Sequence, residues 1–210
     1  MIWDSVIWKL ELRKELLKFE RLISKHNIQS KYLGFRIEQF YFVSAYIIRK
    51  LLEAKKLSIE CCSRDIHLET CSYIGGDRFL DKLNAHRIEE FYALNNAQHT
   101  TKDLRWICNK LIHSFCFFPL FNRRNKFCGI YFNTDENKRK ELNYLEHRIF
   151  KKVLAACIKD DIVFSSTNRA ANKTVSFSKM ANAKKWLKSK EKKLEEPSVK
   201  EIEIFNSQPI

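Results

Sequence analysis

Glycine and proline are scarce in this sequence, with 4 Gly and 3 Pro among 210 residues. Both residues interrupt helices and form the tight turns that join short strands. Their scarcity argues against a sandwich of many short strands and favours long helices. Hydrophobic residues make up 45% of the chain, which is enough to build a packed core at this length.

Several functional signatures are also missing. No uncharged apolar run approaches the length that spans a bilayer. The segment MIWDSVIWKLELRKELL carries charges throughout and lacks the basic-then-apolar order of a signal peptide. We find no Gly-rich phosphate loop, no Ser–His–Asp order and no paired-carboxylate metal motif. We therefore expect a cytoplasmic protein without a membrane partner, and we predict no cofactor.

Acidic residues are few relative to basic ones. The chain has 39 Lys and Arg against 25 Asp and Glu, which gives a net charge of +14. Such an excess creates a positive field that attracts polyanions, because neutralising phosphates releases their condensed counterions. Nucleic acid is the favoured partner on this ground. An anionic membrane surface and acidic proteins are the alternatives.

The cysteines show no disulfide framework, because their number is odd and their spacing is irregular. They are Cys61, Cys62, Cys71, Cys108, Cys116, Cys128 and Cys157. We expect free thiols in a reducing compartment. Cys61, Cys62, His67 and Cys71 are soft ligands within a short span. However, adjacent cysteines replace the C-x-x-C knuckle of zinc sites and no matching pair follows, so we predict no metal.

Hydrophobic periodicity indicates several helices. They are expected over 4–26, 37–57, 88–94, 100–118 and 142–158. Residues 59–98 otherwise favour an irregular segment. The first helix is apolar on two sides, which predicts either deep burial or contact with a second subunit.

Short strands are predicted over 127–133 and 162–164. From residue 165 the chain is rich in Ser, Asn and Lys, and residues 172–196 favour one basic helix. The predicted organisation is a helical bundle over 1–120, a strand-and-helix appendage over 121–165, and a basic C-terminal helix and tail over 166–210. The predicted fold class is mainly α.

One helical line carries residue types that could perform chemistry. Arg105, Asn109 and His113 are spaced by four and therefore lie along one side of the helix predicted over 100–118. An Arg can hold a phosphate with its planar fork, and a His can exchange a proton near neutral pH. Such a pair suits metal-free RNA cleavage, in which the 2′-hydroxyl is the nucleophile. A nonenzymatic phosphate contact and a solvated or subunit-facing edge are the alternatives.

The segment CNKLIHS (108–114) resembles the signature helix of HEPN domains, which are small all-helical bundles. In ribonuclease members the motif is an Arg, a polar residue such as Asn, and a His one turn later. The resemblance implies a dimer whose two motifs form one metal-independent RNA-cleaving cleft, in a toxin–antitoxin or antiviral defence system. Asn109 and His113 match this motif, whereas Cys108 stands where the Arg is expected.

The missing cation could come from Arg105, one turn earlier, or from Arg49. Arg49 and Glu53 are four apart, so a structural ion pair is the alternative role for Arg49. Arg49 can serve the site only if the helix over 37–57 packs beside the motif helix. The segments over 47–58 and 109–114 also resemble an uncharacterised group of small bacterial proteins, which implies no activity.

Basic residues follow the motif and recur near the end of the chain. The candidate nucleic-acid contacts are Arg123, Arg124, Lys126, Lys184, Lys185, Trp186 and Lys188. Lysines around an aromatic ring suit backbone contact together with base stacking, and a solvated helix face is the alternative.

Two functions are compatible with these residues. The first is a nucleic-acid-directed protein, with RNA favoured, that acts as a metal-independent endoribonuclease through His113, Asn109 and either Arg105 or Arg49. The second is a noncatalytic nucleic-acid-binding or scaffolding subunit. The expected assembly is a homodimer or part of a larger complex.

Overall fold

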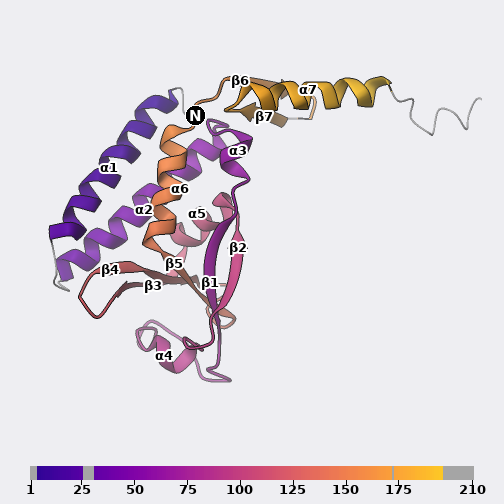
Figure 1. Ribbon diagram of the computed structural model, residues 1–210. Helices are drawn as coiled ribbons and strands as arrows, with labels where there is room; N and C mark the ends of the chain where they lie inside the picture. The colour runs from indigo at the N-terminus through magenta and orange to yellow at the C-terminus, as the bar shows by residue number, and fades with distance from the viewer. Residues whose placement is uncertain (1–3, 26–30, 172, 196–210) are drawn as a thin grey trace, which may run out of the picture.

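The computed structural model describes residues 4–25, 31–171 and 173–195. A five-stranded antiparallel sheet lies at its centre, in the order β2-β1-β5-β4-β3 (Figure 1). Its strands are β1 (Ile66–Ser72), β2 (Gln98–Lys102), β3 (Ser114–Phe121), β4 (Phe127–Thr134) and β5 (Glu141–Glu146). The sheet therefore joins strands from sequence regions that are more than 60 residues apart, as in the pairing of Glu69 with Tyr144.

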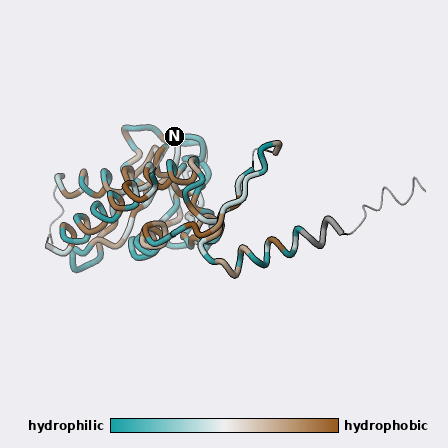
Figure 2. Tube along the Cα trace, turned by 90° about the horizontal axis from the view of Figure 1, so that it is seen from above, coloured by the Kyte–Doolittle hydropathy of each residue, from teal (hydrophilic) through white to brown (hydrophobic). Residues whose placement is uncertain are grey.

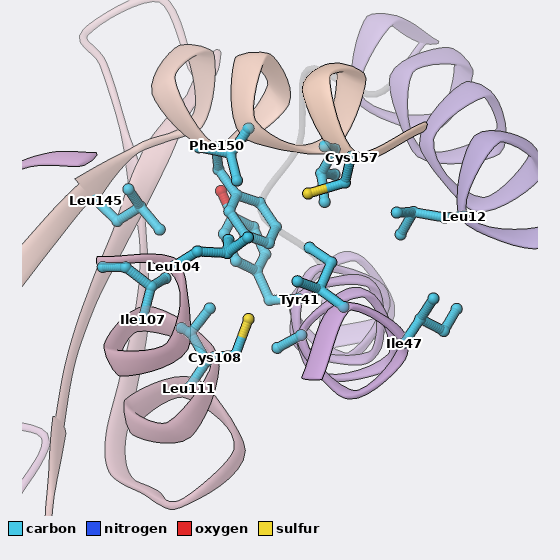
Figure 3. Packing of buried hydrophobic residues seen from close by; sticks show 14 of the residues in the cluster. Leu12, Tyr41, Ile47, Leu104, Ile107, Cys108, Leu111, Leu145, Phe150 and Cys157 are labelled. Atoms are coloured by element: carbon cyan, nitrogen blue, oxygen red, sulfur yellow. The ribbon is translucent and has the colours of Figure 1, made fainter. Parts of the chain in front are cut away.

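One face of this sheet is covered by helices (Figure 1). They are α1 (Ser5–Lys25), α2 (Lys31–Glu53), α5 (Leu104–Ile112) and α6 (His147–Lys159). The main core lies between helices and sheet, where the rings of Tyr41 and Phe150 stack with their centroids 4.6 Å apart (Figure 3). Ile107 and Leu111 of α5 are completely buried in the same core.

The segment between β1 and β2 covers part of the opposite face. It contains α4 (Ile88–Phe91) and contributes Leu80, Phe91 and Tyr92 to a second, smaller core. The Tyr92 hydroxyl accepts a hydrogen bond of 2.6 Å from the side-chain amide of Asn133 on β4. Together with α3 (Ile59–Cys62), these elements complete a body in which the sheet is covered on both sides.

The prediction of a mainly α helical bundle is wrong. Besides its helices, the described part of the chain forms a five-stranded antiparallel sheet and a two-stranded sheet, so the protein has an α/β fold. The scarcity of glycine argued wrongly against strands, because asparagines form hairpin turns in this chain. Asn125 adopts the left-handed region at φ 55°, and the Asn122 side chain accepts hydrogen bonds from the backbone of Arg124 and Lys126. Asparagine tolerates this geometry because its short side chain bonds to the local backbone.

The helix predicted over 100–118 is the main source of the error. It ends at Ile112, and residues 114–121 form β3. The two adjacent aromatic residues there face opposite sides of the sheet, with Phe117 packed in the main core and Phe118 in the smaller one. A period of two with aromatic residues suits a strand packed on both faces.

The C-terminal part leaves this body as two arms. A hairpin of β6 (Phe164–Asn168) and β7 (Lys173–Phe177) is followed by α7 (Met180–Glu195). The Glu60 carboxylate on α3 anchors the start of α7, because it accepts 3.1 Å and 2.8 Å hydrogen bonds from the Ser178 backbone and the Asn182 side chain. The tail predicted from residue 197 lies outside the described residues.

The outer side of α1 carries an exposed apolar stripe. Val6, Ile7, Leu10 and Leu17 each keep about half of their surface exposed, from 48% to 60%. The inner side of the same helix buries Leu12, so the helix is apolar on two sides as the sequence indicated. Contact of the outer stripe with a second subunit stays a prediction. Among the described helices, none is long and apolar enough to cross a membrane.

The close approach of β4 and β5 gives a stability prediction. A Cβ atom at Gly129 would lie 2.4 Å from the Leu145 carbonyl oxygen, so Gly129→Ala forces the strands apart. We expect a loss of about 1–3 kcal/mol in the free energy of unfolding, measured by urea denaturation.

The matched control is Gly34→Ala in α2, where no atom lies within 4 Å of the added Cβ. Alanine is favoured over glycine inside a helix by about 0.5–1 kcal/mol, so this variant should be at least as stable as the parent. Equal stability of the parent and Gly129→Ala would contradict the β4–β5 packing.

Candidate active site

The candidate site lies where α5 passes into β3. Asp103 caps the start of α5 by accepting a 2.7 Å hydrogen bond from the Trp106 backbone. The helix ends at Ile112, and the C-cap residue His113 adopts φ −105° and ψ 26° before the chain extends into β3. The imidazole is therefore exposed at a junction whose backbone is fixed by a helix on one side and a paired strand on the other.

Arg49 of α2 meets His113 at this junction. The Nη1 atom of Arg49 lies 3.4 Å from Nε2 of His113. The same guanidinium donates from Nε to the Glu53 carboxylate at 3.0 Å, and Lys50 donates to that carboxylate as well. These hydrogen bonds, first from Arg49 and then from Lys50, lower the pKa of Glu53. Glu53 therefore stays ionised and holds the guanidinium at the imidazole.

The contact also indicates the tautomer of His113. A guanidinium only donates hydrogen bonds, so Nε2 of the imidazole must be the acceptor. A hydrogen bond of this kind would use the neutral tautomer that carries its proton on Nδ1. The 3.4 Å separation is longer than an ordinary N–H···N contact, so a substrate hydroxyl could displace the arginine donor from Nε2.

Cys108 shows why this helix carries no arginine at the position expected from the motif. Its side chain is completely buried in the main core, where α5 packs on α2 (Figure 3). Burial raises the pKa of its thiol to about 12, so it packs as a small neutral group. A guanidinium there would lose its hydration in an apolar core. Arg49 instead supplies a cation from the neighbouring helix.

A pocket of about 530 Å³ opens beside His113. It is lined by Trp106, Asn109, Lys110, His113, Thr134, Asp135 and Glu136. Lys110 reaches the Glu136 carboxylate at 3.5 Å and also lies 5.8 Å from the centre of the Trp106 ring. The pocket thus combines a cation, an aromatic face and the imidazole.

Asn109 has an unused polar atom at this pocket. Its side-chain oxygen is buried and has no hydrogen-bond partner among the residues that the structure describes. A buried oxygen without a partner costs about 1–3 kcal/mol, and such costs are common at binding sites. A donor on a bound ligand would satisfy this oxygen.

The structure places the other predicted site residues elsewhere. Arg105 lines a separate pocket of about 290 Å³ with Lys55, which follows the end of α2, and Lys173 of β7, two helical turns from His113. The hairpin tip that carries Arg123, Arg124 and Lys126 lies at the far end of β3, about 25 Å along the strand from His113.

The remaining candidates lie on α7 and near α3. Lys184, Lys185 and Lys188 are exposed on α7, and Trp186 is half-buried against Phe177. Cys61, Cys62, His67 and Cys71 are split between α3 and β1. In the described part of the chain, no group of three His, Cys, Asp or Glu side chains is placed to hold a metal ion.

Sequence reasoning missed Trp106, Lys110 and Thr134 as pocket residues. Trp106 and Lys110 lie on the predicted motif helix, but their role depends on the β4–β5 turn, which brings Thr134 and Glu136 against them. No local sequence signal links positions that lie more than 20 residues apart. Comparison with family models, curated proteins and solved structures finds no match to this chain.

A second titratable cluster was also missed, inside the body. His147 at the start of α6 contacts the buried Tyr41 hydroxyl through Nδ1 at 3.2 Å and the Glu20 carboxylate through Nε2 at 2.8 Å. Lys151 donates to the other oxygen of Glu20 at 2.6 Å. These hydrogen bonds join three helices, so we interpret the cluster as a polar link between α1, α2 and α6.

In this cluster the pKa values of His147 and Glu20 are both lowered, whereas burial raises the pKa of Tyr41. Burial lowers the pKa of His147, and the Glu20 carboxylate offsets only part of this effect. Burial raises the pKa of Glu20, but hydrogen bonds from Lys151 and His147 outweigh it, so the net pKa is lowered. In both cases the unfolded chain binds protons more readily, so acid favours unfolding.

We therefore expect the free energy of unfolding to fall as the pH drops below 6.5, where His147 begins to titrate in the unfolded chain, and again below 4.5 for Glu20. Urea denaturation between pH 7.5 and 4 measures this dependence. In His147→Gln the decrease that starts near pH 6.5 should shrink. An identical pH profile in parent and variant would contradict the assignment.

Proposed function

We propose that this chain is an RNA-directed protein that cleaves single-stranded RNA without a metal ion at the pocket beside His113. The observation that carries the proposal is the Arg49–His113 contact at 3.4 Å, next to a pocket with an aromatic face and an unpaired buried oxygen. These groups supply an anion-binding cation, an acid–base group and binding contacts.

The proposed reaction uses the 2′-hydroxyl of the substrate as nucleophile. Neutral His113 accepts the proton of this hydroxyl at Nε2, and the 2′-oxygen attacks the adjacent phosphorus. The bond from phosphorus to the 5′-oxygen breaks, and the imidazolium returns the proton to that leaving oxygen. The products are a 2′,3′-cyclic phosphate and a 5′-hydroxyl end.

Arg49 holds the scissile phosphate in this scheme. Its guanidinium already lies at the imidazole, and Glu53 orients it through the bond from Nε. A planar fork can bind two phosphate oxygens and stabilise the charge that grows on them during attack. The buried oxygen of Asn109 accepts a donor from the substrate and so positions it. Trp106 offers a half-buried ring on which a base can stack.

The alternative is a noncatalytic nucleic-acid-binding subunit. The acidic side chains of Asp135 and Glu136 at the pocket favour this alternative, because carboxylates repel a phosphate. Pairing of Lys110 with Glu136 reduces this repulsion. In that case, the basic surfaces bind nucleic acid and a partner carries the chemistry. The biological setting that the HEPN resemblance implies, a toxin or antiviral defence system, stays a prediction.

The proposal is tested by incubating end-labelled single-stranded RNA with the full chain in EDTA and identifying the termini. We expect cleavage to 2′,3′-cyclic phosphate ends, and a rate loss of about 10²–10⁴ in His113→Ala, the usual contribution of a general acid–base group. His99→Ala, an exposed histidine on β2, is the matched control and should cut at the parental rate.

Two arginine variants separate the two candidate cations. Arg49→Gln should lose cleavage, because its guanidinium contacts His113, whereas Arg105→Gln removes the same charge from a different pocket. An equal loss in both variants would contradict the Arg49 assignment. Binding of RNA with no cleavage by the parent would instead favour the noncatalytic subunit.

A further inference from the structure

The two C-terminal arms enclose a cleft. The β6–β7 hairpin and α7 start together and then diverge, so that they form a V open to solvent (Figure 2). Between them lies a pocket of about 470 Å³. It is lined by Ser166, Thr167, Asn168, Lys173, Val175, Trp186 and Lys190, with Ala171 at the turn.

One face of the hairpin points into this cleft. Ser166 pairs with Val175 and Asn168 pairs with Lys173, and side chains at these alternate positions share a face. Phe177 continues that face and meets the Trp186 ring at a centroid distance of 5.8 Å. Trp186 is therefore supported by the hairpin on one side while it lines the cleft with its remaining surface.

The chemistry of the cleft fits a nucleotide. Lys173 and Lys190 bring positive charge, and the Lys190 ammonium lies 5.8 Å from the Trp186 ring. Ser166 and Asn168 add neutral donors and acceptors. No carboxylate side chain lines the cleft among the residues that the structure describes. An indole face beside two cations suits a base and its phosphates.

We propose that this V-shaped cleft binds single-stranded nucleic acid, with one base stacked on Trp186 and neighbouring phosphates paired with Lys173 and Lys190. The inference deepens the proposed function and rests on it only for RNA as the substrate. A duplex does not fit, because its bases are stacked on one another and cannot reach the indole. A membrane surface does not fit the polar hairpin wall.

The position of residues on α7 provides an internal control. Lys190 follows Trp186 by four residues and lies on the same side of the helix, whereas Lys188 follows by two and lies on the opposite side. Both lysines are exposed, and each substitution with glutamine removes one charge. Lys190→Gln and Lys188→Gln therefore have the same net charge but should affect nucleic-acid binding unequally.

The experiment measures binding by fluorescence anisotropy with labelled eight-nucleotide probes. A DNA octamer and a 2′-O-methyl RNA octamer both lack a free 2′-hydroxyl, so neither can be cleaved and binding is independent of catalysis. The full chain is compared with Trp186→Leu, which keeps apolar contact with Phe177, and with Trp186→Phe, which keeps an aromatic face. Circular dichroism checks that each variant folds.

We expect Trp186→Leu to weaken octamer binding by about 5- to 100-fold, which corresponds to the loss of one stacked base. This applies to whichever octamer the parent binds. Trp186→Phe should retain most of the affinity. Lys190→Gln should reduce the slope of log affinity against log salt by about 0.7, and Lys188→Gln should reduce it less, because Lys188 lies on the opposite side of α7 from the cleft.

Parental affinity in Trp186→Leu, or equal salt slopes in the two lysine variants, would overturn the inference. The inference would also be overturned if the parent protein bound neither octamer, or if it bound a duplex of the octamer sequence more tightly than the single strand. If octamer binding depends on Trp186 but RNA is not cleaved, the cleft stands and the proposed ribonuclease function fails.

Discussion

The packing of α2 against α5 is the contact on which the candidate site depends. It buries Cys108 completely and sets Arg49 beside His113, although 64 residues separate the two in sequence. The same contact joins the helical layer to the sheet, because Leu104, Ile107 and Leu111 of α5 fill the main core. Any change that separates α2 from α5 would therefore both move Arg49 away from His113 and open the main core. Structural stability and the proposed chemistry are therefore linked through one interface.

The helices of the first half could be predicted because their apolar spacing is regular over many turns. The prediction over 4–26 closely matches α1 (Ser5–Lys25). The strands were harder, since β3 shares its aromatic residues with a helical pattern. Pro119 illustrates the problem. A proline normally marks the end of a helix, but here it lies within β3, which is an edge strand of the sheet and needs no hydrogen bond from that position on its open side.

The site was predictable only as a set of alternatives. The sequence offered two arginines for His113, and local spacing favoured Arg105 because it lies on the same helix. In the folded chain Arg105 is too far from His113, because a residue eight positions earlier on a helix is about 12 Å away along the helix axis. Arg49 comes from another helix and lies in hydrogen-bonding range. Residues such as Thr134 and Glu136 reach the pocket through a turn between strands, and single-sequence patterns do not encode that approach.

The pocket and the C-terminal cleft are held in place by different kinds of force. Arg49 and His113 project from elements that share the main core, so burial of apolar surface fixes their geometry. The arms are anchored through Glu60, whose carboxylate bonds to Ser178 and Asn182. Burial raises the pKa of Glu60, but the hydrogen bonds, above all that from Asn182, outweigh this effect and lower the pKa overall, so the anchor remains charged near neutral pH. The proposed chemistry requires atomic positioning and lies in the part of the chain that is held by the main core. The proposed stacking on Trp186 tolerates small shifts of the arms, because a base can slide over a flat ring without losing contact.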